Sequence, residues 1–171
     1  MWKKILKTGF VKLMHPTMKL HGAAELAPCT EINISGGGSI TLGKNVMTNK
    51  RVTFSAVGGK LVIGDNVSFN RNAIVVCRSS IEIGSHTSFG PNVVIYDHDH
   101  QLGSAGYEGN RYKCSPVVIK DNCWIGANVT ILRGTVIGEG CVIGANTVIK
   151  GEIPPYSIVK SARELSIEPL R

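Results

Sequence analysis

The fold of this 171-residue chain is decided by residues 117–150, which read VVIKDNCWIGANVTILRGTVIGEGCVIGANTVIK. Isoleucine recurs there at a spacing of six, at Ile119, Ile125, Ile131, Ile137, Ile143 and Ile149. A small or β-branched residue stands two positions before each isoleucine. Because residues two apart on a strand share a face, each hexad predicts a short strand with both ends pointing inward, followed by a corner. A helix would instead repeat with a period of about 3.6 residues.

The same spacing continues toward the N-terminus. The inward positions there are Leu42, Thr48, Phe54, Ile63, Phe69, Val75, Ile83, Phe89 and Ile95. Glycine often follows the inward residue directly, as at Gly126, and asparagine often stands three positions after it, as at Asn128. Both residue types tolerate left-handed backbone angles, so we expect them at corners. Three hexads close one triangular coil, and residues 30–158 predict an all-β parallel prism of about five coils.

Four insertions interrupt the hexads, and each follows the third strand of a coil. Two or three extra residues come after Ile34, Phe54 and Val75, and 18 come after Ile95. The insertions should therefore lie along one edge of the prism, where the longest, residues 96–116, is expected to form a long loop. Loops on a rigid scaffold often carry function, and this one contains the sequence Asp-His-Asp-His. A surface loop with incidental histidines is the alternative.

The composition fits this architecture and limits the functions. Apolar residues make up 43% of the chain, and its 20 glycines, about 12% against an average near 7%, indicate many tight corners. An all-helical protein is excluded. The net charge of +7 suits an anionic partner such as a phosphorylated cofactor, an acidic glycan or a membrane surface. Five cysteines without a Cys-x-x-Cys motif argue against a disulfide framework or a structural zinc site and favour a reducing cytoplasm.

The pattern of an aliphatic residue, glycine, two variable residues, a small residue and a further variable one resembles the hexapeptide-repeat acyltransferases. The resemblance covers roughly residues 30–158. It implies a left-handed parallel β-helix and a transfer of an acyl group from coenzyme A. The left hand comes from the family, because sequence spacing alone gives the prism but not its hand.

Acetyl transfer from a thioester to a hydroxyl needs a base for the hydroxyl proton and a donor for the oxyanion. Histidine is the natural base near neutral pH. The segment from Ile95 to His100 resembles the catalytic segment of the sugar acetyltransferases of this fold, and an ungapped count places the catalytic histidine at His100. His98 is the second candidate, although a turn also explains it. His86, at the same corner position of the preceding coil, is expected to be structural.

Two carboxylates flank these histidines. Asp97 or Asp99 could hold the second ring nitrogen of His100 and so fix its tautomer. A main-chain carbonyl could do the same, and a solvated carboxylate is the alternative for each residue.

Asn70 breaks the asparagine rule, because it lies one position after Phe69 instead of three. Residues 69–72, Phe-Asn-Arg-Asn, match the family motif in which this asparagine contacts the reacting centre, and an ordinary corner is the alternative. Asn70 and His100 occupy different corners, separated across a face by roughly 10 Å or more on strand geometry. If both serve one site, a second subunit must bring them together. We therefore expect a homotrimer with sites between subunits, as the resemblance also implies.

The resemblance to the family implies that the acyl donor, acetyl-coenzyme A, lies along the C-terminal coils. Trp124 is the middle residue of its strand and points outward, where it could border the donor groove or a subunit interface. Close-approach positions and cations for the phosphates complete the predicted cofactor set, with ordinary corners and solvated charges as alternatives: Gly126, Ala127, Gly144, Ala145, Lys150, Lys160 and Arg163. The C-terminal motif departs from that of the family at residues 161–164, which puts the adenine-end contacts in question.

The ends of the chain lie outside the repeat. Residues 1–29 form a basic, amphipathic extension that could lie on an anionic membrane or dock on the open end of the prism. Its apolar run is too interrupted for a signal peptide, so we expect a cytoplasmic protein, at the inner membrane face if the extension binds lipid. Residues 159–171 are expected to be a tail.

The sequence thus favours an acetyl-coenzyme A-dependent O-acetyltransferase that acts on a sugar hydroxyl, in a surface polysaccharide or its precursor. A serine or antibiotic acetyltransferase is the alternative within the class. A zinc hydratase like the γ-type carbonic anhydrases and a non-catalytic scaffold are alternatives outside it. Neither a metal nor a nucleic-acid partner is expected.

Overall fold

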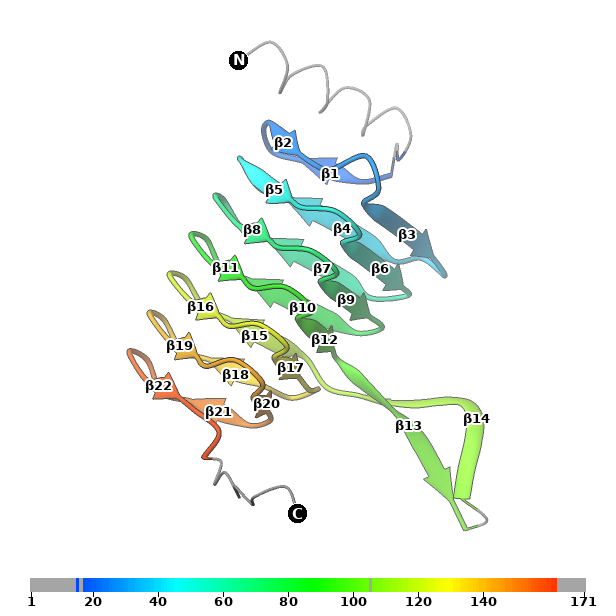
Figure 1. Ribbon diagram of the computed structural model, residues 1–171. Coiled ribbons are helices and arrows are strands. Elements are labelled where there is room, and N and C mark those ends of the chain that lie inside the picture. The colour runs from blue at the N-terminus through cyan, green and yellow to red at the C-terminus, as the bar shows by residue number, and fades with distance from the viewer. Residues whose placement is uncertain (1–14, 16, 105, 163–171) are drawn as a thin grey trace, which may run out of the picture.

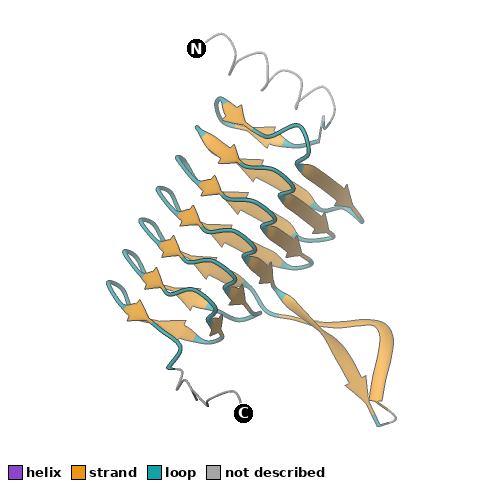
Figure 2. Ribbon diagram, viewed as in Figure 1, coloured by secondary structure: helices purple, strands orange, loops and turns teal. Residues whose placement is uncertain are grey.

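The computed structural model describes residues 15, 17–104 and 106–162, which form three parallel sheets and one hairpin (Figure 1). The sheets are the three faces of a prism (Figure 2). Sheet A contains β1 (Lys19–Leu20), β4 (Ser39–Leu42), β7 (Lys60–Ile63), β10 (Ser80–Ile83), β15 (Val117–Ile119), β18 (Val136–Ile137) and β21 (Glu152–Ile153). Sheet B contains β2 (Ala24–Glu25), β5 (Val46–Thr48), β8 (Ser68–Phe69), β11 (Ser88–Phe89), β16 (Trp124–Ile125), β19 (Val142–Ile143) and β22 (Ile158–Val159).

Sheet C completes the triangle. It contains β3 (Glu31–Ser35), β6 (Thr53–Val57), β9 (Ile74–Cys77), β12 (Val94–Tyr96), β17 (Thr130–Ile131) and β20 (Val148–Ile149). The chain visits sheets A, B and C in turn, so the described residues make six complete coils and two strands of a seventh. The predicted parallel prism is confirmed. It is about one coil longer than expected, because β1 and β2 already pair with β4 and β5 ahead of residue 30.

The interior is a buried column formed mainly by the predicted inward residues. Ile119, Ile125 and Ile131 are at most 1% exposed, and so are their counterparts in most coils. Phe69 stacks on Phe89 with ring centroids 4.6 Å apart and meets Phe54 edge-on at 5.0 Å. Burial of these side chains supplies the main stabilisation, at about 25 cal/mol per Å² of apolar surface removed from water.

Asparagine and glycine have different roles at the corners, although the sequence analysis predicted left-handed backbone angles for both. The corner asparagines adopt left-handed angles as predicted, with φ between 56° and 60° at Asn45, Asn66, Asn72, Asn92, Asn122, Asn128 and Asn146. The glycines after the inward residues do not have positive φ, which corrects the prediction for them. A Cβ at Gly126 would lie 2.7 Å from the main-chain nitrogen of Ala145. Glycine is needed there because the next coil packs directly against it.

The four insertions lie along one edge, after β3, β6, β9 and β12 of sheet C. The longest was expected to be a loop and is instead an antiparallel hairpin of β13 (His98–Gly103) and β14 (Gly106–Cys114). The hairpin extends away from the prism (Figure 1). The register shifts between His100 and Leu102, so the strand carrying the two histidines is irregular at that point.

Candidate functional site

His100 lies on β13 with an exposed side chain and a fixed ring. Its Nδ1 is 3.1 Å from the carbonyl oxygen of Gly109. A carbonyl oxygen can only accept, so Nδ1 carries the ring proton and donates it. Nε2 of the neutral ring is then an unprotonated acceptor. The rings of Tyr107 and Tyr112 pack against the imidazole, with centroid distances of 5.0 and 4.8 Å. This geometry suits a general base.

His98 is held differently, by the carboxylate of Asp97. Nδ1 of His98 lies 3.0 Å from Oδ1 of Asp97, and its ring meets Tyr96 and Tyr112 edge-on. His98 belongs to strand β13 and is not among the residues with positive φ, whereas His86 has a φ of 58° and occupies a corner as expected. The structure thus contains an Asp–His pair, but the histidine in it is His98 and not His100.

Asp97 is a buried hub at the root of the hairpin. It is 0% exposed and accepts hydrogen bonds from the main-chain nitrogens of Arg78 (2.9 and 3.0 Å) and Ser79 (2.6 Å). The thiol of Cys77 donates to it over 3.4 Å. Burial, together with the negative charge of Asp97, raises the pKa of Cys77 to about 12. The carboxylate therefore ties the turn after β9 to the hairpin.

Asp99 anchors the hairpin to a later coil. Its Oδ2 accepts from Nε of Arg133 over 2.5 Å, and Nη1 of Arg133 donates to Ser115 over 3.4 Å. The two predicted supporting carboxylates thus bind His98 and Arg133. Of the alternatives open for His100, the main-chain carbonyl is the group that contacts Nδ1.

A hollow of about 650 Å³ surrounds this end of the hairpin. It is lined by Asp99, His100, Gln101, Leu102, Tyr112, Lys113 and Arg133. Leu102 and Tyr107 nearby are 73% and 65% exposed, so one side of the hairpin presents apolar surface to its surroundings. The hollow is large enough for a small-molecule acceptor.

Asn70 lies in the turn after β8, at a different edge from the hairpin. Its Oδ1 accepts from the main-chain nitrogen of Arg71 over 2.8 Å and from Nδ2 of Asn49 over 3.3 Å. These two contacts occupy Oδ1. Among the described residues Nδ2 of Asn70 makes no bond, so it is the group left to donate. Asn70 lines a hollow of about 270 Å³ that shares no lining residue with the one at His100.

Of the predicted cofactor residues that the structure describes, Trp124 lies on sheet B and the others lie in turns of the last coils. Trp124 on β16 is 60% exposed, and the strand register places Val142 and Ile158 behind it in one outward column of sheet B. The following turns carry Gly126, Ala127, Gly144 and Ala145. The close approach at Gly126 is explained by coil stacking alone. Lys150 and Lys160 are exposed, and Arg163 lies outside the described residues.

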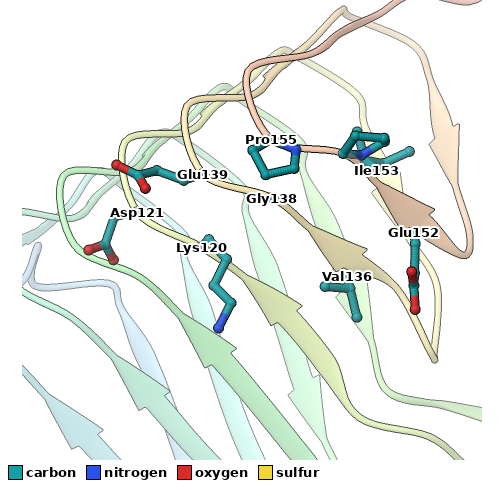
Figure 3. Close-up of a pocket in the computed structure, with 9 residues that line it drawn as sticks. Lys120, Asp121, Val136, Gly138, Glu139, Glu152, Ile153 and Pro155 are labelled. Carbon is teal, nitrogen blue, oxygen red and sulfur yellow. The ribbon is translucent and has the colours of Figure 1, made fainter.

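A larger hollow of about 760 Å³ lies elsewhere, over β18 and β21 of sheet A and the adjoining corners (Figure 3). Asp121, Glu139 and Glu152 border it together with one cation, Lys120. Three carboxylates repel the phosphates of a coenzyme, and no histidine lines this hollow. The hollow at the hairpin is therefore the better candidate site. Among the described residues, no group of three His, Cys, Asp or Glu side chains could hold a metal ion, and no helix could span a membrane.

Sequence reasoning did not identify Tyr112, Arg78 or Arg133 as part of the site. Arg78 and Arg133 could have been found from their position along the edge that carries the insertions. Arg78 lies in the two-residue insertion one coil before the hairpin, and Arg133 lies in the corresponding turn one coil after it. Tyr112 carried no such signal, because its position depends on the register of β13 against β14.

Comparison with known proteins agrees with this architecture. The model of the bacterial transferase hexapeptide family, six repeats, matches residues 116–151. WbbJ of Escherichia coli, provisionally named a lipopolysaccharide biosynthesis O-acetyl transferase, is 34% identical over 138 residues, which cover 74% of this chain and 69% of WbbJ. The chain belongs to the hexapeptide-repeat transferase family, and its prism is consistent with the left-handed β-helix of that family.

Two further relatives complete the comparison. Galactoside O-acetyltransferase of Escherichia coli is 32% identical over 115 residues, which cover 67% of this chain and 56% of the relative. The hexapeptide-repeat acetyltransferase VCA0836 of Vibrio cholerae, solved with acetyl-coenzyme A, has a TM-score of 0.59 at 25% identity, covering 89% of this chain and 71% of that structure. The chain spans 51% to 69% of the length of the first three curated relatives.

Proposed function

We propose that this protein is an acetyl-coenzyme A-dependent O-acetyltransferase that acts on a sugar hydroxyl, in a surface polysaccharide or its precursor. The observation that carries the proposal is the geometry of His100. The carbonyl of Gly109 accepts a hydrogen bond from Nδ1–H, so Nε2 is the ring nitrogen available to accept a proton, beside a hollow of about 650 Å³. The names of WbbJ and galactoside O-acetyltransferase supply the class of acceptor, and the complex of VCA0836 supplies the donor.

In the proposed reaction, Nε2 of His100 removes the proton of the sugar hydroxyl as its oxygen attacks the thioester carbonyl. The tetrahedral intermediate collapses when the carbon–sulfur bond breaks, and the coenzyme thiolate takes the proton from the imidazolium. The products are the acetylated sugar and the free thiol, with no covalent enzyme intermediate. The Gly109 carbonyl stabilises the imidazolium, because its contact with Nδ1–H strengthens when the ring is charged.

An oxyanion donor must complete this site, and we assign that role to Nδ2 of Asn70. Asn70 and His100 lie at different edges of the prism and line separate hollows, so one chain does not bring them together. A homotrimer would place the hairpin of one subunit at the Asn70 corner of the next. The exposed Leu102 and Tyr107 on the hairpin suit such a contact.

The donor would lie along the outward column of Trp124, Val142 and Ile158. This apolar strip suits the pantetheine arm, and Lys150 and Lys160 are the described cations that can meet phosphates. The net charge of +7 favours an anionic donor. Five free cysteines and the use of acetyl-coenzyme A fit a cytoplasmic location. The N-terminal segment proposed to bind membranes lies mostly outside the described residues.

The test is thiol release from acetyl-coenzyme A across a panel of sugar acceptors. We expect His100→Ala to lose turnover by about 10²–10⁴-fold, which is the usual contribution of a general base, while coenzyme binding by calorimetry is retained. His86→Ala is the matched control, since His86 occupies a corner and does not line the hollow, and it should retain turnover. Retained turnover in His100→Ala would reject the base. Sedimentation of an active monomer would reject the site between subunits.

A further inference from the structure

Arg78 stands in the short insertion after β9, directly before the hairpin along the same edge of the prism. Its main-chain nitrogen donates to Asp97, which also holds His98. The main chain of the turn that carries Arg78 is therefore bonded to the root of the hairpin, independently of the contacts of the Arg78 side chain. This position explains how a residue 20 positions before His98 reaches the site.

The side chain of Arg78 packs on an aromatic ring that touches both histidines. Its guanidinium carbon Cζ lies 3.6 Å from the ring centroid of Tyr112. The same ring lies 5.4 Å from the imidazole of His98 and 4.8 Å from that of His100, measured between centroids. A guanidinium over an aromatic face at this distance is a favourable cation–π contact.

In the part of the chain that the structure describes, the Arg78 side chain is held by its contact with the Tyr112 ring and not by a hydrogen bond at Nε. Its Nε is buried and has no hydrogen-bond partner among the described residues. Buried polar nitrogens are normally paired, so an arginine held in place by hydrogen bonds would be expected to bind a carbonyl or a carboxylate through Nε. The guanidinium is placed instead to cover the ring of Tyr112. Its charge also reaches the base of the hairpin: desolvation raises the pKa of Cys114, Asp97 raises it further, and Arg78 and Arg133 lower it.

We propose that Arg78 is a positioning residue for the reaction proposed above: it clamps Tyr112, and through that ring it fixes the orientation of His98 and His100. The inference rests on the proposed function for its effect on turnover but not for its effect on the imidazoles. Arg78 touches neither acceptor nor donor in this scheme. Its loss should lower kcat and leave substrate binding intact.

The variants separate charge, length and ring. Arg78→Met keeps an unbranched side chain without the cation, whereas Arg78→Lys keeps a cation that can still sit over the ring. Tyr112→Leu removes the ring. We expect Arg78→Met and Tyr112→Leu each to lower kcat roughly tenfold or more, since small misplacements of catalytic groups are costly. The KM of Arg78→Met should stay within about twofold, whereas Tyr112→Leu should raise KM as well, because Tyr112 lines the hollow. Arg78→Lys should restore much of kcat, and the double variant Arg78→Met/Tyr112→Leu should be no worse than either single one.

The second readout is independent of activity. Carbon–proton NMR signals of the imidazoles report their orientation against the Tyr112 ring, and signals of His98 and His100 should shift in Arg78→Met. Lys44→Met, which removes an exposed cation at another corner, is the matched control and should leave kcat and the signals unchanged. Melting temperatures check that each variant is folded.

The outcomes distinguish the two proposals. Unchanged kcat and unchanged imidazole signals in Arg78→Met would overturn the clamp. A parallel loss of kcat and coenzyme binding, with unchanged signals, would also overturn it, because it would show a general structural defect. If the wild-type protein acetylates none of the sugars while the imidazole signals still shift in Arg78→Met, the proposed function is rejected and the clamp is supported.

Discussion

The carboxylate of Asp97 accepts a hydrogen bond from Nδ1 of His98 over 3.0 Å. The better-exposed His100, two residues further along β13, is held by the main-chain carbonyl of Gly109. The two histidines are therefore different chemically. His98 is part of a buried hydrogen-bond network that ties the turn after β9 to the root of the hairpin, whereas His100 has one ring nitrogen bonded and the other without a partner among the described residues.

Asp97→Asn should therefore affect stability more than chemistry. The amide keeps one acceptor oxygen for the nitrogens of Arg78 and Ser79, but its NH₂ group faces groups that are themselves donors. We expect a loss of about 1–3 kcal/mol in the free energy of unfolding, the usual cost of a buried polar group left without its partner. Urea unfolding measures it, and kcat should fall less than in His100→Ala.

Asp65→Asn is the control for Asp97→Asn. Asp65 accepts a single main-chain hydrogen bond, from Lys44 over 2.7 Å, at an exposed corner. Its substitution should cost clearly less than that of Asp97. A folded Asp97→Asn protein without turnover would show that His98, and not His100, is the base.

The ion pair between Asp99 and Arg133 should hold the hairpin against the next coil. Asp99 is 45% exposed and Arg133 15%, so a coupling energy of up to about 1 kcal/mol is expected. Hydrogen exchange of the amides of β13 and β14 should quicken in Asp99→Asn and in Arg133→Met, and the double variant should add little. Additive effects in this double-mutant cycle would contradict the tether.

The prism could be predicted because it follows from a short repeat in the sequence. Inward residues such as Ile125 and corner residues such as Asn128 repeat at fixed spacing, so one rule applies to every coil. The role of glycine could not be read correctly, since the sequence shows that Gly126 follows Ile125 but not that Ala145 of the next coil lies against it. Close approach is a property of stacked coils.

The arrangement of side chains in the candidate site depends on contacts between residues that are far apart in the sequence. The spacing of residues 97–100 indicated the right segment, and the catalytic candidate could be counted along it. Which carboxylate meets which histidine could not be deduced, because Asp97 is also bound by the turn at Arg78 and Asp99 by Arg133, 34 residues later. The register of β13 against β14, which places Tyr112 opposite His100, is set by an irregular hairpin.

Gly126→Ala tests the stacking role of the corner glycines. The new Cβ would lie 2.7 Å from the nitrogen of Ala145, a main-chain atom that cannot move aside alone. We expect a loss of about 1–3 kcal/mol in the free energy of unfolding, as for other overpacked sites. Gly37→Ala is the comparison for backbone strain without crowding: Gly37 has a φ of 78°, and a Cβ there would meet nothing within 4 Å. Gly37→Ala should cost stability through backbone strain alone, and a neutral Gly126→Ala beside it would show that glycine serves only for left-handed angles.

The buried thiol of Cys77 should make the free energy of unfolding depend on pH in the alkaline range. Its pKa is raised to about 12 by burial and by Asp97, whereas an unfolded thiol titrates near 9. The folded state therefore holds the thiol proton more tightly, and this contribution to stability is complete below pH 9 and is lost as the pH rises from about 9 toward 12. The free energy of unfolding should fall over that window in the wild-type protein and fall less steeply in Cys77→Ala. Cys29→Ala, at an exposed thiol, should keep the wild-type slope. Equal slopes in wild-type protein and Cys77→Ala would show that the thiol proton is not linked to folding.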